Sequence, residues 1–114
     1  MISDWSGAAL EYAFGLEKPV LFIDVPKKIN NPEFDRIDCV PLEVSIREKI
    51  GMVVSPAALD DVPEAISRLV RNPADFSEQI RVARAESIFN PGQAAEVGAD
   101  SILRLFDELY PQQA

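Results

Sequence analysis

The sequence contains no histidine and only one cysteine, Cys39. Histidine is the usual general base near neutral pH, so its absence excludes Ser/His/Asp and Cys/His catalytic sites from this chain. A single cysteine forms no internal disulfide, and with no second cysteine and no histidine there is neither a zinc cluster nor an activated thiol. We therefore expect Cys39 to be structural, and we expect no catalytic residue, no metal and no cofactor here.

Basic charge and long apolar runs are also scarce. The chain has 11 basic and 19 acidic residues, a formal net charge of −8, which repels phosphate backbones and argues against nucleic acid as a partner. No apolar run approaches membrane-spanning length, and the N-terminus lacks the regions of a signal peptide. Together with the single thiol, these features predict a cytoplasmic protein.

What the sequence does contain is an alternation of short apolar runs with helical patterns. Ile2 ends a first strand, residues 19–25 form a second strand that is buried on both faces, and residues 52–55 form a third. Residues 8–16 form a helix between the first two strands, and residues 26–44 form a long loop. This order predicts an α/β fold with a short parallel sheet and a helical C-terminal half.

Capping patterns set the expected helix boundaries. Ser6 is the candidate N-cap of the first helix, and S-x-x-E at residues 45–48 predicts a capping box for a short helix that ends at Gly51. Residues 61–64 repeat the capping pattern before the apolar stripes of the C-terminal half. We expect Pro111 to Ala114 to be a frayed tail.

The turn from the first strand into the first helix is the best candidate for a binding site. Ligands of open parallel sheets lie at the carboxyl ends of the strands, and Ser6 and Gly7 offer unpaired backbone N–H groups and a hydroxyl for a phosphate. Glu11 lies about one turn further, within reach of a ribose, and Asp4 orients the turn or contacts substrate. The alternative is that Ser6 only caps the helix, Asp4 interacts with the helix dipole, and Glu11 is solvated.

Lys27 and Lys28 follow the second strand and therefore belong to the same edge of the sheet. Lysines at this place can contact a polyphosphate or an anionic acceptor, although exposed lysines are common and need no function. Trp5 either stacks on a ligand or packs beside the end of the strand. The sequence by itself thus favours ligand binding without catalysis.

Several segments of the chain resemble one known family. The N-terminal ones are Ile2-Ser3-Asp4-Trp5-Ser6-Gly7, Glu11-Tyr12-Ala13 and Lys18-Pro19-Val20-Leu21-Phe22. They resemble the pattern I-S/T-D-Y/W-S-S/G … D/E-Y/F-A … K/R-P-I/V-x-F of bacterial CDP-glycerol glycerophosphotransferases, which build teichoic-acid-like polymers of the cell envelope. Residues 61–66, 81–89 and 90–94 are similar to the C-terminus of the same family.

The resemblance implies a two-domain GT-B-type fold in which residues 1–110 form the C-terminal portion of the Rossmann-like donor-binding domain. It implies that Ser6 and Gly7 hold the donor phosphate and that Glu11 takes the place of the acidic residue of the family. The catalytic histidines of the family have no counterpart, so transfer of glycerol phosphate belongs to a full-length parent. We expect this chain alone, which enters its first motif within four residues, to be an inactive fragment of that parent.

Two other functions remain open. The wider GT-B class shares these features, so the donor is either CDP-glycerol or a nucleotide-sugar. In both cases the missing N-terminal part of the parent brings the acceptor, and we expect the parent to be peripheral at the inner face of the membrane. The other function is a non-catalytic module that binds a partner protein. In either case an uncovered sheet edge and apolar helix faces predict a homo-oligomer for the isolated chain.

Overall fold

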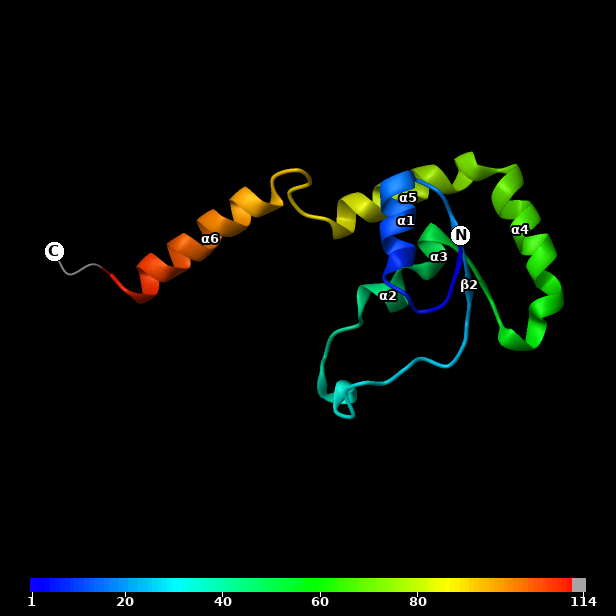
Figure 1. Ribbon diagram of the computed structural model, residues 1–114, viewed down its shortest axis with the longest axis horizontal. Helices are drawn as coiled ribbons and strands as arrows, with labels where there is room; N and C mark the ends of the chain where they lie inside the picture. The colour runs from blue at the N-terminus through cyan, green and yellow to red at the C-terminus, as the bar shows by residue number, and fades with distance from the viewer. Residues whose placement is uncertain (112–114) are drawn as a thin grey trace.

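The computed structural model describes residues 1–111 (Figure 1). The elements are β1 (Ile2–Ser3), α1 (Ala8–Leu16), β2 (Val20–Ile23), η1 (Phe34–Arg36), α2 (Leu42–Ser45), α3 (Arg47–Ile50), β3 (Gly51–Val54), η2 (Pro56–Asp61), α4 (Val62–Arg71), α5 (Pro73–Ser87) and α6 (Ala94–Leu109). The predicted mixed α/β class and the helical C-terminal half are confirmed. Of the tail predicted at 111–114, residues 112–114 lie outside the described residues.

The three strands form one parallel sheet in the order β1-β2-β3. Leu21 of the central strand lies opposite Ile2, and Val20 lies opposite Gly51. A Cβ at Gly51 would lie 1.8 Å from the Val20 carbonyl oxygen, so the ladder admits no side chain at this point. Because the strands are parallel, their carboxyl ends meet at one edge, where the predicted binding residues follow them.

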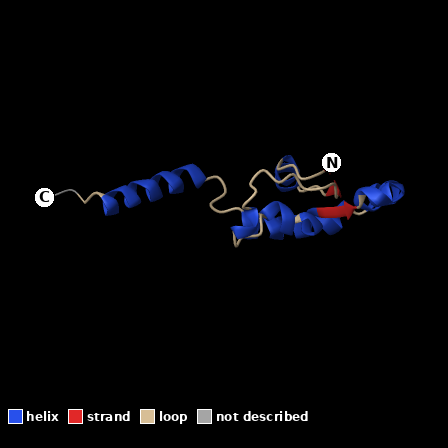
Figure 2. Ribbon diagram, turned by 90° about the horizontal axis from the view of Figure 1, so that it is seen from below, coloured by secondary structure: helices blue, strands red, loops and turns tan. Residues whose placement is uncertain are grey.

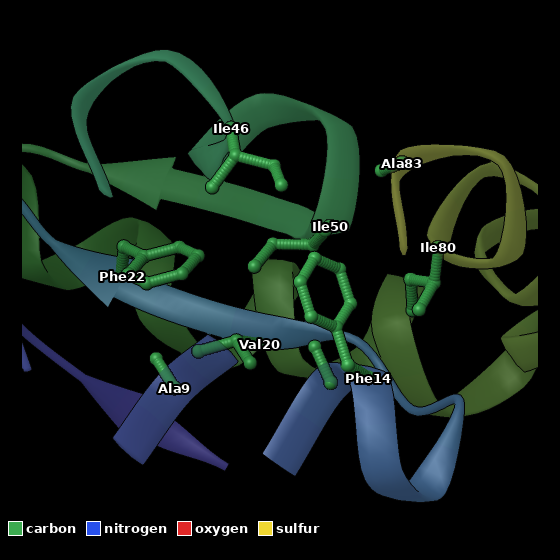
Figure 3. Packing of buried hydrophobic residues seen from close by; sticks show 9 residues of the cluster. Ala9, Phe14, Val20, Phe22, Ile46, Ile50, Ile80 and Ala83 are labelled. Atoms are coloured by element: carbon green, nitrogen blue, oxygen red, sulfur yellow. The ribbon is translucent and has the colours of Figure 1, made fainter. Parts of the chain in front are cut away.

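Side chains alternate along β2, and helices cover both faces of the sheet. Val20 and Phe22 belong to one core cluster with buried residues of α1, α3 and α5 (Figure 3). Leu21 points to the other face, where it clusters with Val54 and with Ala65 of α4. The continuous apolar run of β2 therefore reflects burial on both faces, as the sequence predicts.

The predicted capping box at residues 45–48 is wrong. A short helix, α2, begins at Leu42 inside the predicted loop, and Ser45 is its last residue. The Ser45 hydroxyl donates to the Leu42 carbonyl at 3.3 Å instead of capping the next helix. Ile46, which is buried, stands between α2 and α3, so core packing of this residue decides where the second short helix begins.

The capping pattern at residues 61–64 predicts the start of α4 correctly, with Asp61 as its N-cap residue, but the cap hydrogen bond does not form. Asp61 makes no side-chain cap hydrogen bond, because the 3-10 helix η2 runs directly into α4. The side chain that caps this segment is Ser55, whose Oγ accepts from the Ala57 N–H at 3.2 Å. The helical segment therefore starts at Pro56, about two turns of 3-10 helix before the first residue of α4.

Arg84 of α5 holds the C-terminal end of α1. Its Nη1 donates to the Phe14 carbonyl at 2.6 Å, and its Nη2 pairs with the Glu17 carboxylate at 2.8 Å. Glu17 follows α1 with a left-handed backbone, φ 52°, and also pairs with Arg81 at 3.3 Å. The hydrogen bond from Arg81 to Glu78, followed by the attraction of the same carboxylate, raises the pKa of Arg81.

Helix α6 extends away from the α/β layers (Figures 1 and 2). All of α6 lies within the described range, and none of its residues is buried. The radius of gyration is 19.0 Å, whereas a compact domain of about 100 residues has a radius near 13 Å. Across residues 1–111, no helix combines the length and the apolar character needed to cross a membrane.

Candidate functional site

The turn from β1 into α1 lies at the carboxyl edge of the sheet, as predicted. Ser6 Oγ accepts from the Ala8 N–H at 3.3 Å, and the Ser6 carbonyl accepts from the Ala9 N–H at 3.1 Å. Ser6 therefore caps the first turn of α1, from one residue before the N-cap position, which Gly7 occupies. A Cβ placed on Gly7 would meet no side chain or distant backbone within 4 Å, so the space beside the Gly7 Cα is open.

Arg47, at the start of α3, is the residue of this edge that the sequence patterns missed. Its side chain is only 7% exposed, and Nη1 donates to Asp24 Oδ1 at 2.8 Å. The guanidinium carbon lies 3.9 Å from the centroid of the Trp5 ring and 5.1 Å from that of Phe22. Arg47 thus forms a cation–π contact with each ring and an ion pair with Asp24, which directly follows β2.

Two nitrogens of Arg47 have unused hydrogen-bonding capacity. Nε and Nη2 are buried, and neither has a hydrogen-bond partner among the residues that the structure describes. Buried donors of this kind are rare in folded proteins, because each loses its water without gaining an acceptor. The site therefore favours the entry of a group that supplies acceptor oxygens.

The space beside Arg47 is small in this conformation. Arg47 lines a cavity of about 10 Å³ together with Asp4, Trp5, Ser6 and residues of the core. A cavity of this volume holds about one water molecule, so a phosphate group enters only if a side chain moves. Trp5 is the side chain that covers the guanidinium, and it is held by the hydrogen bond that Nε1 donates to the Val25 carbonyl at 2.7 Å.

Trp5 also lines a larger pocket. Its volume is about 290 Å³, and it is lined by Trp5, Lys27, Lys28, Asn30, Pro41, Glu43 and Val44. Lys27 Nζ lies 6.0 Å from the centroid of the Trp5 ring, which leaves the ammonium group close to this tryptophan. Trp5 and Glu43 line both spaces, so displacing Trp5 would join the small cavity to the lysine pocket.

The structure brings most of the predicted site residues to one edge. Asp4 and Ser6 line the small cavity, and Lys27 and Lys28 line the pocket beside it. Glu11 is exposed in the first turn of α1 and lines neither space. One feature of the sequence could have indicated this arginine. It directly follows Ile46 and precedes Ile50 by about one turn, and both isoleucines are buried.

The charges around Arg47 are mixed. The carboxylates of Asp4, Asp24 and Glu43 lie on this edge with the two lysines, so any anion here would contact carboxylates as well as cations. Among residues 1–111, no group of three or more Asp, Glu, Cys or His side chains is arranged to hold a metal ion. The site is therefore built around one buried guanidinium and a helix start.

Cys39 does not have the structural role that the sequence analysis assigns to it. The residue is exposed in the long segment after β2, and its thiol lies 3.9 Å from the Val40 carbonyl oxygen. All residues from 26 to 41 are exposed, so the thiol is not packed in the core.

Comparison of the chain with family models, curated proteins and solved structures gives no match.

Proposed function

We propose that the carboxyl edge of the sheet binds the diphosphate of a nucleotide-linked donor, and that the chain is the C-terminal portion of a Rossmann-like donor domain. The observation that carries the proposal is the pairing of the helix start at Gly7, where the space beside Cα is open, with the buried guanidinium of Arg47, whose Nε and Nη2 lack acceptors among the described residues. Phosphate oxygens are strong acceptors for guanidinium groups and for the N–H groups of a helix start.

Binding requires Trp5 to move, because a cavity of about 10 Å³ cannot hold a phosphate. Once Trp5 swings out, the small cavity and the lysine pocket become one site. In that site, Arg47 and the turn at Ser6 and Gly7 bind one phosphate, and Lys27 and Lys28 bind the other or the group attached to it. Ser6 then has two roles, as a helix cap and as a hydroxyl donor to the phosphate.

The resemblance to CDP-glycerol glycerophosphotransferases supports CDP-glycerol as the donor and glycerol phosphate as the transferred group. In this proposal the chain binds the donor, and the parent enzyme supplies the catalytic groups and the acceptor site. The parent is cytoplasmic and peripheral at the inner face of the membrane. A nucleotide-sugar is the alternative donor, because Arg47 and the start of α1 would bind the diphosphate of either compound.

Intrinsic fluorescence tests the proposal directly, since Trp5 is the single tryptophan of the chain and covers the proposed phosphate site. Titration with CDP-glycerol should change the emission of Trp5 with a saturable dose dependence, and CDP should compete. Titration with a UDP-sugar separates the two donor classes. Absence of any change with all three compounds up to about 1 mM would overturn the proposal, because a specific diphosphate site should be occupied at that concentration.

Variants of Arg47 distinguish binding from stability. Arg47→Lys keeps the charge but removes the planar arrangement of donors, so it should weaken CDP-glycerol binding by roughly 10-fold or more. Arg104→Lys is the matched control, since Arg104 lies in α6, far along the chain from this edge. Equal loss of affinity in both variants, with both folded by circular dichroism, would contradict a role for Arg47.

A further inference from the structure

Helix α6 carries a complete apolar stripe that no other element of residues 1–111 covers. The stripe, which we call the α6 stripe, consists of Ala95, Gly98, Ala99, Ile102, Leu105, Phe106 and Leu109. These residues repeat at intervals of three and four, so they share one face of the helix. Ile102 is 69% exposed, Phe106 53% and Leu109 64%. A stripe of this kind is normally buried against another element, and within residues 1–111 none is packed on it.

The α6 stripe changes in size along the helix. Its N-terminal half contains only small residues, Ala95, Gly98 and Ala99, and its C-terminal half contains the large residues Leu105, Phe106 and Leu109. Ile102 stands at the boundary between the two halves. A surface with one small half and one large half is complementary in shape to a copy of itself that runs in the opposite direction.

We propose that the α6 stripe is a dimerisation surface, on which α6 of a second copy of this chain packs antiparallel. The twofold axis passes beside Ile102. Leu105 then lies over Gly98 of the partner subunit, Phe106 over Ala99 of the partner subunit, and Leu109 over Ala95 of the partner subunit. The contact is isologous, so it closes after two copies and leaves no free apolar half.

The charged residues of α6 agree with this orientation. Asp100, Arg104 and Asp107 lie on the face opposite the stripe, and Glu96 and Glu108 lie at its flanks, so no charged side chain stands within the stripe itself. A parallel pair would place the three large residues against their own copies and would leave Gly98 and Ala99 facing each other across a gap. In an antiparallel pair, large residues lie against small residues in both halves of the contact, so we infer the antiparallel orientation.

The large residues of the α6 stripe are also exposed. Ile102, Leu105, Phe106 and Leu109 are each more than half exposed. An antiparallel pair buries these four side chains on each subunit, which removes apolar surface from water and favours association.

Light scattering during gel filtration tests the oligomeric state. The chain should elute with twice its mass of 12.6 kDa and should dissociate on dilution. Phe106→Glu should raise the dissociation constant of the dimer by about 100-fold or more, because the dimer contains two copies of each side chain. Arg104→Glu, a substitution to the same residue on the opposite face, should leave the dimer intact. A monomer at about 100 µM would overturn the proposal and assign the stripe to a different partner.

Cysteine crosslinking tests the direction of the two helices in a Cys39→Ser background. Ile102→Cys should form an intermolecular disulfide on mild oxidation, because the two copies of residue 102 meet at the twofold axis. Leu109→Cys should not, since the two copies of residue 109 lie about 21 Å apart along antiparallel helices. Efficient crosslinking of Leu109→Cys would indicate a parallel pair and overturn the antiparallel arrangement. Formation of the dimer does not require nucleotide binding, so the proposed dimer and the proposed diphosphate site can each be wrong while the other holds.

Discussion

The guanidinium carbon of Arg47 lies 3.9 Å from the centroid of the Trp5 ring, and the same guanidinium forms an ion pair with Asp24 at 2.8 Å. These three residues come from the start of α3, the turn after β1 and the end of β2. One buried cation therefore links three segments at the carboxyl edge of the sheet. Cation–π contacts of desolvated groups contribute about 2 kcal/mol, so this contact both holds the edge closed and opposes the displacement of Trp5.

Asp24→Asn should destabilise the protein by about 1–3 kcal/mol, because it removes the only carboxylate paired with the Arg47 guanidinium in the described part of the chain. We expect a value below that of a fully buried pair, since the Asp24 side chain is 50% exposed. Urea unfolding measures the difference. Asp35→Asn, an exposed aspartate in the long segment after β2, serves as the control and should change the free energy of unfolding by less than about 0.5 kcal/mol.

Gly51→Ala and Gly15→Ala should change stability in opposite directions. At Gly51 a Cβ would lie 1.8 Å from the Val20 carbonyl oxygen, so β2 and β3 must separate, at a cost of about 3–5 kcal/mol. At Gly15, inside α1, a Cβ meets no atom within 4 Å, and alanine should add about 0.5–1 kcal/mol. The melting temperatures of both variants, measured by thermal unfolding, check these two predictions. Equal melting temperatures for the two would contradict the strand register at Val20.

Arg84→Ala should cost about 1–2 kcal/mol of stability, because it leaves the Phe14 carbonyl and the Glu17 carboxylate without the guanidinium that joins α5 to α1. The side chains of this pair are 38% and 34% exposed, which lowers the expected cost. Arg71→Ala, in the exposed last turn of α4, is the control. Hydrogen exchange should show faster opening of the last turn of α1 in the Arg84 variant alone.

Ser6 substitutions separate helix capping from ligand binding. Ser6→Ala should destabilise the protein by about 0.5–1 kcal/mol through loss of the hydrogen bond to the Ala8 N–H, whereas Ser6→Gly should cost only a few tenths. If the hydroxyl also contacts phosphate, both variants should weaken CDP-glycerol binding equally. Unchanged affinity in Ser6→Gly would leave Ser6 with the capping role alone.

Much of the fold follows from local sequence patterns. The apolar run around β2 and the helix after Ser6 are visible in the sequence, because apolar periodicity and helix caps act within a few residues. The same patterns place Ser6, Lys27 and Lys28 at one edge of the sheet, since parallel strands put their carboxyl ends together. The predicted binding function and the predicted donor stay predictions.

The sequence by itself determined the α/β order, the parallel sheet and the edge of the sheet where the candidate residues gather, since these follow from the order of short local patterns along the chain. Only the tertiary structure decided that Arg47 is buried against Trp5 and that α6 leaves the body with its apolar stripe uncovered. The burial of Arg47 depends on contacts between segments that are far apart in the sequence. The exposure of α6 follows from the lack of such contacts among the described residues. The cap hydrogen bonds predicted at residues 45–48 and 61–64 do not form. Packing of Ile46 and the helical turn before Asp61 outweigh this local hydrogen-bond pattern.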